Sequence, residues 1–326
     1  YNCSALRTCA IPNGVKSVGE NAFYNCTALE SLTIGNSVES IGDSAFFSCY
    51  ALMSITLPES LTSIGDFAFS ECHKLVEIIN LSSIELTAGS MSHGSIASNA
   101  IEVHKESSKL VNVDGFIFYP TQKSVHLVDC KKTDSIIVLP DSYLGRKYTV
   151  NQYAFHNNTT IASVTISEKV TKIKDHAFDG CFKLAEVINK ASHLEIKLGY
   201  EDNGMVAAYA KEIHSAESNM KLVGDFLFYT FEGHSYLMAY EGSESLMLLP
   251  QPSENQTYSI YKYAFSGRSD ITSVTVPKGV YAVGEYAFKD CTSIETISIA
   301  NGINDLGVGA FYNCKSLIRV NIPESI

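Results

Sequence analysis

The sequence lacks an excess of positive charge. Its 24 lysines and arginines are outnumbered by 35 aspartates and glutamates, which gives a formal net charge of −11 at pH 7. A protein that binds nucleic acid through the phosphates needs a basic patch or stripe. The sequence shows no such stripe, and we therefore expect no nucleic-acid partner.

Long apolar runs are also missing. No run reaches the length of about 18 apolar residues that a transmembrane helix requires, so we expect no membrane insertion by this chain. The given sequence contains no signal peptide. The chain opens inside one unit of the repeat described below and stops at Ile326, where another unit should begin. We therefore expect a fragment of a longer protein, with its export signal and anchor outside the fragment.

The sequence contains none of the common catalytic motifs, neither G-x-S-x-G nor H-E-x-x-H, a P-loop or G-x-G-x-x-G. It also has no C-x-x-C pair. Seven of its nine cysteines recur at one repeat position, which favours free buried thiols over a zinc site or a disulfide framework. An occasional disulfide between neighbouring coils, such as Cys26 with Cys49, remains an alternative. We expect no catalytic residue, no cofactor and no metal site.

Two sets of polar residues recur along the chain. His104 and His214 occupy matching places in two long segments of similar sequence, described below. A strand histidine duplicated with its surroundings is favoured there over a metal ligand or an acid–base group. Asp43, Asp66 and Asp175 share one repeat position, where stacked carboxylates could hold calcium. A solvated or helix-capping role is favoured, because other coils carry different residues at this position.

The sequence does contain an Ala-Phe pair in eight copies, and the copies within each run are 23 residues apart. This spacing is typical of leucine-rich repeats. The apolar residues that follow each Phe end in period-two alternation, which predicts a short strand with one buried face. Since one such unit cannot bury its own apolar face, the units must stack. We expect the Phe side chains to form a buried ladder, made of Phe23, Phe46, Phe69, Phe155, Phe178, Phe265, Phe288 and Phe311.

Glycine stands four residues before four of these Phe residues. We interpret it as marking a turn with an unusual backbone conformation. The four residues are Gly19, Gly42, Gly65 and Gly284.

Two long segments interrupt the 23-residue spacing, and they resemble each other in a constant register, as if one block had been duplicated. Apolar runs around Pro- or Gly-rich turns predict a β-hairpin in each one. In the first hairpin residues 115–119 face residues 125–128, and in the second residues 226–229 face residues 236–240. Residues 205–210 could form a short helix.

The chain is therefore predicted to be a single leucine-rich repeat solenoid over residues 1–326, with a parallel sheet and two hairpin-containing insertions. The predicted segments are repeat coils at 1–79, an insertion at 80–150, coils at 151–188, the duplicated insertion at 189–260 and coils at 261–326.

The pattern V-x-x-I-G-x-x-A-F-x-x-C-x-x-L-x-x-I-x-I-P, almost complete from Val38 to Pro58, resembles the BspA-like class of bacterial leucine-rich repeats. The insertion motif from Asp114 to Tyr119 also looks like that family. The resemblance covers essentially the whole chain. It implies a curved right-handed superhelix, β-rich within the α/β class, on a secreted or surface-anchored protein. In some members such regions are associated with adhesion to host or matrix proteins.

The leading hypothesis is a non-enzymatic recognition or adhesion module of a bacterial cell-surface or secreted protein. Its partner would be a protein, such as a host matrix or cell-surface protein, or a glycan. The alternative is a structural spacer that holds another domain away from the cell. An enzyme has no support in the sequence.

Tyrosine and arginine on loops are common interface anchors, so the insertions supply the candidate partner contacts. These are Tyr143, Arg146, Tyr153, Tyr261 and Tyr263. Tyr148 and Tyr258, which are equivalent in the duplicated block, are interpreted as structural. The outward strand positions carry mostly Ser and Thr, with Glu77 and Glu186 among the variants. We interpret this face as structural, because it lacks aromatic and arginine anchors.

Replacing Phe46, at the centre of a three-coil run, tests the ladder. Phe46→Ala should lower the free energy of unfolding by about 3–5 kcal/mol, because it leaves a cavity in the core. Thermal or chemical denaturation measures this loss. A variant that melts like the parent would show that the ladder is not buried.

Overall fold

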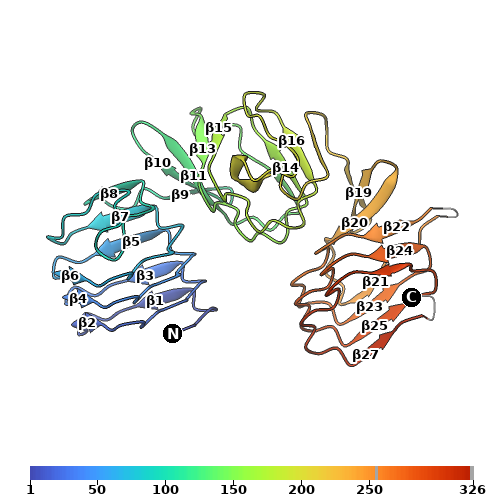
Figure 1. Ribbon diagram of the computed structural model, residues 1–326, viewed down its shortest axis with the longest axis horizontal. Coiled ribbons are helices and arrows are strands. Elements are labelled where there is room, and N and C mark those ends of the chain that lie inside the picture. The colour runs from blue at the N-terminus through green and yellow to red at the C-terminus, as the bar shows by residue number, and fades with distance from the viewer. Residues whose placement is uncertain (254–255, 324–326) are drawn as a thin grey trace. The chain divides into compact units, whose positions relative to one another are not determined.

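The computed structural model describes residues 1–253 and 256–323, built from short strands and very little helix (Figure 1). The chain divides into two compact units. Unit 1 contains residues 1–131 and 149–154, and unit 2 contains residues 132–148 and 155–326. No helix in the described part of the chain has the length and apolarity to cross a membrane.

The coils of unit 1 stack through parallel strands on two walls. Strand partners are one repeat apart, as Ser54 and Glu77 are, so each coil places the same repeat position beside its neighbour. One wall holds β1 (Thr8–Ala10) paired with β3 (Ser31–Thr33), and the sheet of β5 (Ser54–Leu57), β7 (Glu77–Asn80) and β8 (Glu102–His104). The other wall holds β2 (Ser17–Val18), β4 (Ser40–Ile41) and β6 (Ser63–Ile64).

The insertion in unit 1 contains the predicted hairpin, formed by β10 (Phe116–Pro120) and β11 (Val125–Cys130). A further strand that the sequence did not predict, β9 (Val111–Val113), pairs with β10 on its other side. β11 also joins the coil wall, because it pairs in parallel with β13 (Tyr148–Val150). The hairpin is therefore continuous with the solenoid.

Unit 2 repeats this plan. Two of its sheets are four-stranded and parallel. The first contains β12 (Ile136–Val138), β14 (Ser163–Ile166), β16 (Glu186–Asn189) and β17 (Glu212–His214), and the second contains β21 (Leu246–Leu248), β23 (Ser273–Val276), β25 (Thr296–Ile299) and β27 (Arg319–Asn321).

The second hairpin is also present, and it too has an extra strand on one side. A six-stranded sheet joins β18 (Met220–Val223), β19 (Phe226–Phe231) and β20 (His234–Tyr240) to the coil strands β22 (Tyr258–Ile260), β24 (Val280–Val283) and β26 (Asp305–Leu306). The remaining elements are β15 (Val170–Ile173) and one 3₁₀ turn, η1 (Asn203–Met205).

Six of the eight repeated Phe side chains are buried inside the coils, whereas Phe23 and Phe311 are only partly buried. Rings of neighbouring coils stack on one another. Phe46 is fully buried, with ring centroids 5.1 Å from both Phe23 and Phe69. In unit 2, Phe155 stacks on Phe178 at 4.5 Å. Aromatic stacking at these separations adds to the hydrophobic gain of burying each ring.

Backbone hydrogen bonds between coils accompany the Phe ladder. Alternate amides of one Ala-Phe turn donate to the next coil, as Asn21 does to the Asp43 carbonyl at 3.0 Å and Phe23 to the Ala45 carbonyl at 2.7 Å. This geometry places the residues two before and two after each Phe at positive φ. These residues are Asn21, Asn25, Ser44, Ser48, Phe67, Glu71, Tyr153, Asn157, His176, Gly180, Tyr263, Gly267, Tyr286, Asp290, Gly309 and Asn313.

The interpretation of the glycine before the Ala-Phe pair was wrong. Gly19, Gly42, Gly65 and Gly284 are not among the residues with positive φ. Three of them are needed for space instead. A Cβ on Gly42 would lie 2.7 Å from the Glu20 nitrogen, and one on Gly284 would lie 2.6 Å from the Lys262 nitrogen. The glycine lets neighbouring coils approach closely, whereas nothing lies near an added Cβ at Gly19.

The helix suggested for residues 205–210 is also wrong. Only η1 is helical there, and the positive φ of Gly204 and Met205 stops an α-helix from forming. The segment instead closes one more coil, because the Gly204 carbonyl accepts the Phe178 amide at 2.8 Å. Gly94 does the same for Phe69 in unit 1, also at 2.8 Å.

The repeat cysteines also form a ladder, in which a thiol of one coil bonds a backbone carbonyl of the coil before it. The Cys72 thiol donates to the Phe46 carbonyl at 3.2 Å, and the Cys291 thiol donates to the Phe265 carbonyl at 3.0 Å. All nine cysteines are free thiols. Burial raises the pKa of Cys291 to about 12, so its thiol stays protonated and serves as a donor.

Alanine substitutions at Gly94 and Gly89 separate the cost of backbone strain from the cost of steric overlap. Both have positive φ, but a Cβ on Gly94 would lie 2.4 Å from the Gly65 carbonyl oxygen, and nothing lies within 4 Å of one on Gly89. Gly89→Ala should cost about 1–2 kcal/mol through strain alone. Gly94→Ala should cost roughly 1–3 kcal/mol more, because the coils must move apart. Chemical denaturation of the two variants measures both values, and equal losses would contradict the close approach.

Candidate functional site

The predicted partner contacts lie mostly against the coils. Tyr143 is 9% exposed and Tyr261 is 6% exposed, so neither ring is accessible in this structure. Arg146, Tyr153 and Tyr263 are half-buried. Tyr153 stacks on His73 at 4.3 Å, and Tyr263 stacks on Phe182 and Tyr286, each at 5.3 Å. A contact role stays a prediction, and it is restricted to the three half-buried residues.

Tyr148 and Tyr258 occupy equivalent structural positions. Both rings are buried, and their hydroxyls donate to the carbonyls of Pro140 at 2.6 Å and Pro250 at 2.9 Å. Burial raises the pKa of both tyrosines, so both hydroxyls remain donors. Each bond fixes the loop that follows the first strand after a hairpin.

Two strands carry exposed apolar side chains on the outward face, where the neighbouring strands carry Ser and Thr. On β21, Leu246 is 67% and Leu248 is 68% exposed, beside Ser273 and Thr275 of β23. On β12, Ile136 is 39% and Val138 is 60% exposed. Both strands lie at the edge of their sheets. We call these residues the outward apolar pairs.

The sequence contained a signal for the outward apolar pairs. Ile137 and Leu139 are buried, so strand alternation places Ile136 and Val138 on the other face. Leu246 and Leu248 are the equivalent residues of the duplicated block. The sequence interpretation missed them because it treated both segments as ordinary repeat strands.

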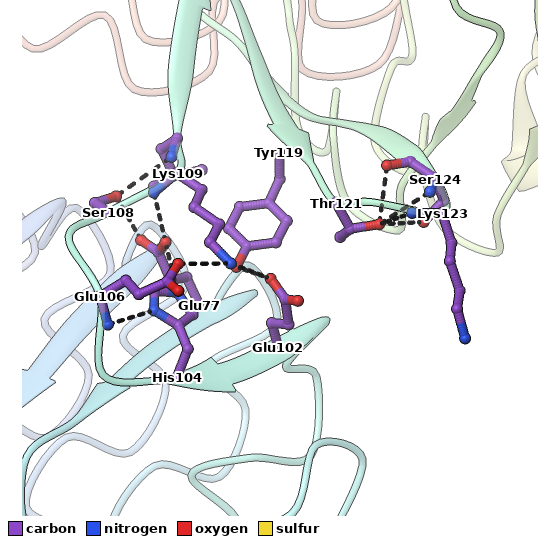
Figure 2. A network of polar contacts seen from close by, with 11 residues as sticks. Glu77, Glu102, His104, Glu106, Ser108, Lys109, Tyr119, Thr121, Lys123 and Ser124 are labelled. Carbon is purple, nitrogen blue, oxygen red and sulfur yellow. Dashed lines mark hydrogen bonds and ion pairs between the residues drawn. The ribbon is translucent and has the colours of Figure 1, made fainter.

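A buried glutamate at the end of the unit 1 coils binds the first insertion (Figure 2). Glu77 was expected on the outward face, but it is 0% exposed, because residues 104–109 fold over it. One carboxylate oxygen accepts from the Ser54 hydroxyl at 2.6 Å and the Ser108 hydroxyl at 2.5 Å. The other lies 2.7 Å from the Lys109 amide and 3.1 Å from His104 Nε2. The carboxylate is thus held at both oxygens.

Glu102 forms the second half of this network. Its Oε2 accepts from Lys109 Nζ at 3.1 Å and from the Tyr119 hydroxyl at 3.0 Å (Figure 2). Burial raises the pKa of Glu102, but the bonds from Lys109 and Tyr119 outweigh it and hold the pKa below its ordinary value. Lys109 therefore places a positive charge beside Glu102, and Tyr119 links Glu102 to β10.

Unit 2 contains the equivalent network around Glu186, which is also 0% exposed against expectation. The counterparts of the unit 1 residues surround its carboxylate. They are the Ser163 hydroxyl at 2.5 Å, the Ser218 hydroxyl at 2.6 Å, the Asn219 backbone amide at 2.6 Å and His214 Nε2 at 3.2 Å. Glu212 accepts from the Tyr229 hydroxyl at 2.8 Å. Ligand atoms of Glu186, Glu212 and His214 all lie within 4.8 Å of one another.

Comparison with known proteins adds a family match. A family model described as the BspA type leucine-rich repeat region, in six copies, matches residues 1–122, 130–200 and 248–326. No curated protein matches the chain.

Several solved structures are similar to this chain. A leucine-rich cell surface protein from Faecalibacterium prausnitzii is 20% identical over 98% of this chain and 60% of its own, with a TM-score of 0.29. The pneumococcal vaccine antigen PcpA is 18% identical over 98% of this chain and 72% of its own, with a TM-score of 0.30. A leucine-rich repeat protein from Bacteroides ovatus is 21% identical over 100% of this chain and 75% of its own, with a TM-score of 0.25. This chain thus spans 60% of the Faecalibacterium protein.

One buried charge differs between the two blocks. In unit 1, Lys74 of the coil pairs with Asp129 of β11 at 2.5 Å, and Lys131 also contacts Asp129 at 2.8 Å. Burial raises the pKa of Asp129, but the two lysines outweigh it and lower the pKa. In unit 2, Ala239 takes the place of Asp129, and among the described residues the buried Lys183 Nζ donates to the Ala264 carbonyl alone, at 3.5 Å. Burial lowers the pKa of Lys183 to about 8.

Lys183→Met should therefore stabilise the protein at pH 7, by about 1–3 kcal/mol. Between pH 8 and 10.5 the unfolded chain binds the lysine proton more tightly than the folded chain, so wild-type stability rises with pH in this window. The advantage of the variant should shrink as pH rises. Urea denaturation at pH 7 and pH 10 measures this change.

Lys74→Met is the matched control for this prediction. It removes a lysine that has a partner, so it should destabilise the protein at pH 7. An advantage of Lys183→Met that does not change with pH would contradict the assignment of a charged, poorly paired lysine.

Proposed function

Because the chain belongs to the BspA-type leucine-rich repeat family, we propose that it is a non-enzymatic recognition module of a bacterial cell-surface or secreted protein, with a role in adhesion. Leucine-rich repeat proteins mediate protein interactions. The location outside the cell and the adhesive role are part of the proposal and rest on the family alone.

The outward apolar pairs carry the proposal. Four exposed aliphatic side chains stand at positions where the neighbouring coils carry Ser and Thr. Exposed apolar groups with polar surroundings are typical of protein-interaction sites. Each pair lies on an edge strand, which is also a place where another chain can add. A protein partner is therefore favoured over a glycan.

The alternative function, a spacer, requires an outward face that is evenly polar. The strands β14, β23 and β25 would suit it, because they carry only Ser and Thr at the outward positions. The apolar pairs on β12 and β21 do not suit it, since exposed Leu side chains reduce solubility without a benefit to a spacer.

The test is binding of the chain to a panel of immobilised matrix proteins, host cell-surface proteins and glycans. Replacing both Leu246 and Leu248 by Ser should weaken binding to the protein partner at least about 30-fold, the effect of losing one hot spot. One further variant replaces Ile136 and Val138 by Ser. Another replaces Arg146 and Tyr263 by Ser. A matched control replaces Ser273 and Thr275 by Ala on the neighbouring strand.

The results separate the two functions. Saturable binding that is lost with either apolar pair and kept in the Ser273/Thr275 control supports recognition through these strands. Binding that only the Arg146/Tyr263 variant loses would keep recognition and move the contact to the insertions. A chain that binds nothing on the panel contradicts the proposal and favours the spacer.

A further inference from the structure

The two glutamate–histidine networks differ at the residue that supplies the positive charge. In unit 1, Lys109 Nζ bonds Glu102 at 3.1 Å and lies 3.4 Å from Glu106. In unit 2 the residue equivalent to Lys109 is Asn219, whose amide Nδ2 donates to Glu212 Oε1 at 2.7 Å. Asn219 fills the position of the lysine but brings no charge. Among the residues that the structure describes, no lysine therefore bonds Glu186 or Glu212.

The networks also differ at the histidine. In unit 1 the Glu106 amide donates to His104 Nδ1 at 3.2 Å, which places the imidazole proton on Nε2, facing Glu77. In the part of the chain that the structure describes, the buried Nδ1 of His214 has no hydrogen-bond partner. Moving the proton of His214 to Nδ1 breaks the hydrogen bond between Nε2 and Glu186 Oε1, so this tautomer forms when a cation takes the place of the Nε2 proton. This tautomer turns the Nε2 lone pair toward the two carboxylates.

The atoms around His214 Nε2 have the spacing of a metal site. Nε2 lies 3.2 Å from Glu186 Oε1 and 3.8 Å from Glu212 Oε1. Ligand atoms about 2.1 Å from a tetrahedral zinc ion are about 3.4 Å apart. One imidazole nitrogen and two carboxylate oxygens form a donor set that suits zinc and related divalent transition metals.

We propose that Glu186, Glu212 and His214 bind one divalent transition-metal ion in unit 2, and that Lys109 replaces this ion in the equivalent network of unit 1. The ion sits between His214 Nε2 and the two carboxylates. Serine hydroxyls and the Asn219 amide orient Glu186, and the Tyr229 hydroxyl orients Glu212. The site joins β16, β17 and residues 218–219, which precede the second hairpin, so metal binding stabilises that junction.

The test uses the full chain after treatment with a chelator, with Zn²⁺ and Co²⁺ as the probes. Calorimetry should give one ion per chain, Co²⁺ should produce visible absorption, and Zn²⁺ should raise the melting temperature. His214→Gln should weaken Zn²⁺ binding at least about 100-fold, as removal of a ligand from a three-residue site does. His104→Gln is the matched control and should leave metal binding unchanged.

Asn219→Lys gives a second test that does not remove a ligand. It copies the unit 1 arrangement, so it should abolish metal binding while the melting temperature without metal stays the same or rises. Circular dichroism of each metal-free variant shows that it is folded. The proposal is overturned if the chain binds neither probe, or if binding persists in both His214→Gln and Asn219→Lys. Two equivalent ions per chain, one of them lost in His104→Gln, would overturn the role assigned to Lys109.

Discussion

The stacking of one coil on the next is the interaction on which the rest of the structure depends. A single coil has too few apolar residues to enclose Phe46, and the ring is buried only because Phe23 and Phe69 cover its two faces. The same contact satisfies the backbone, since amides on the Ala-Phe turn donate to the neighbouring coil. Burial and hydrogen bonding therefore arise together, and stability depends on neighbouring coils rather than on one centre.

The stacking contact also determines which positions can vary. The residues at positive φ beside each Phe include Asn, Ser and Gly, but also Phe67 and Tyr286. A bulky residue is strained in this conformation, by about 1–2 kcal/mol, so the inter-coil hydrogen bonds and the packing must outweigh that strain. By contrast, a side chain at Gly42 or Gly94 would overlap the neighbouring backbone, so the coils there must move apart to admit it.

The sequence predicted the structural features that repeat, and it missed the contacts that form when a segment folds back over a strand. The 23-residue spacing predicted the coils and the Phe ladder, and apolar runs around Pro- or Gly-rich turns predicted both hairpins. β9 was missed because its side chains are exposed and show no alternation of burial. The burial of Glu77 was missed for another reason. On its strand the residue occupies an outward position, and it is buried only when Ser108 and Lys109 fold over it. Periodicity contains no information about such a contact.

The cysteine ladder gives each of several coils its own chemical reporter. A thiol such as Cys72 or Cys291 bonds the carbonyl of the coil before it, and burial raises its pKa. An alkylating reagent reacts with the thiolate, so it reaches these residues only when the local coil opens. Fraying from either end of a stack and opening at an insertion would therefore modify different cysteines first. The natural sequence can thus record the order in which its coils come apart, without any added label.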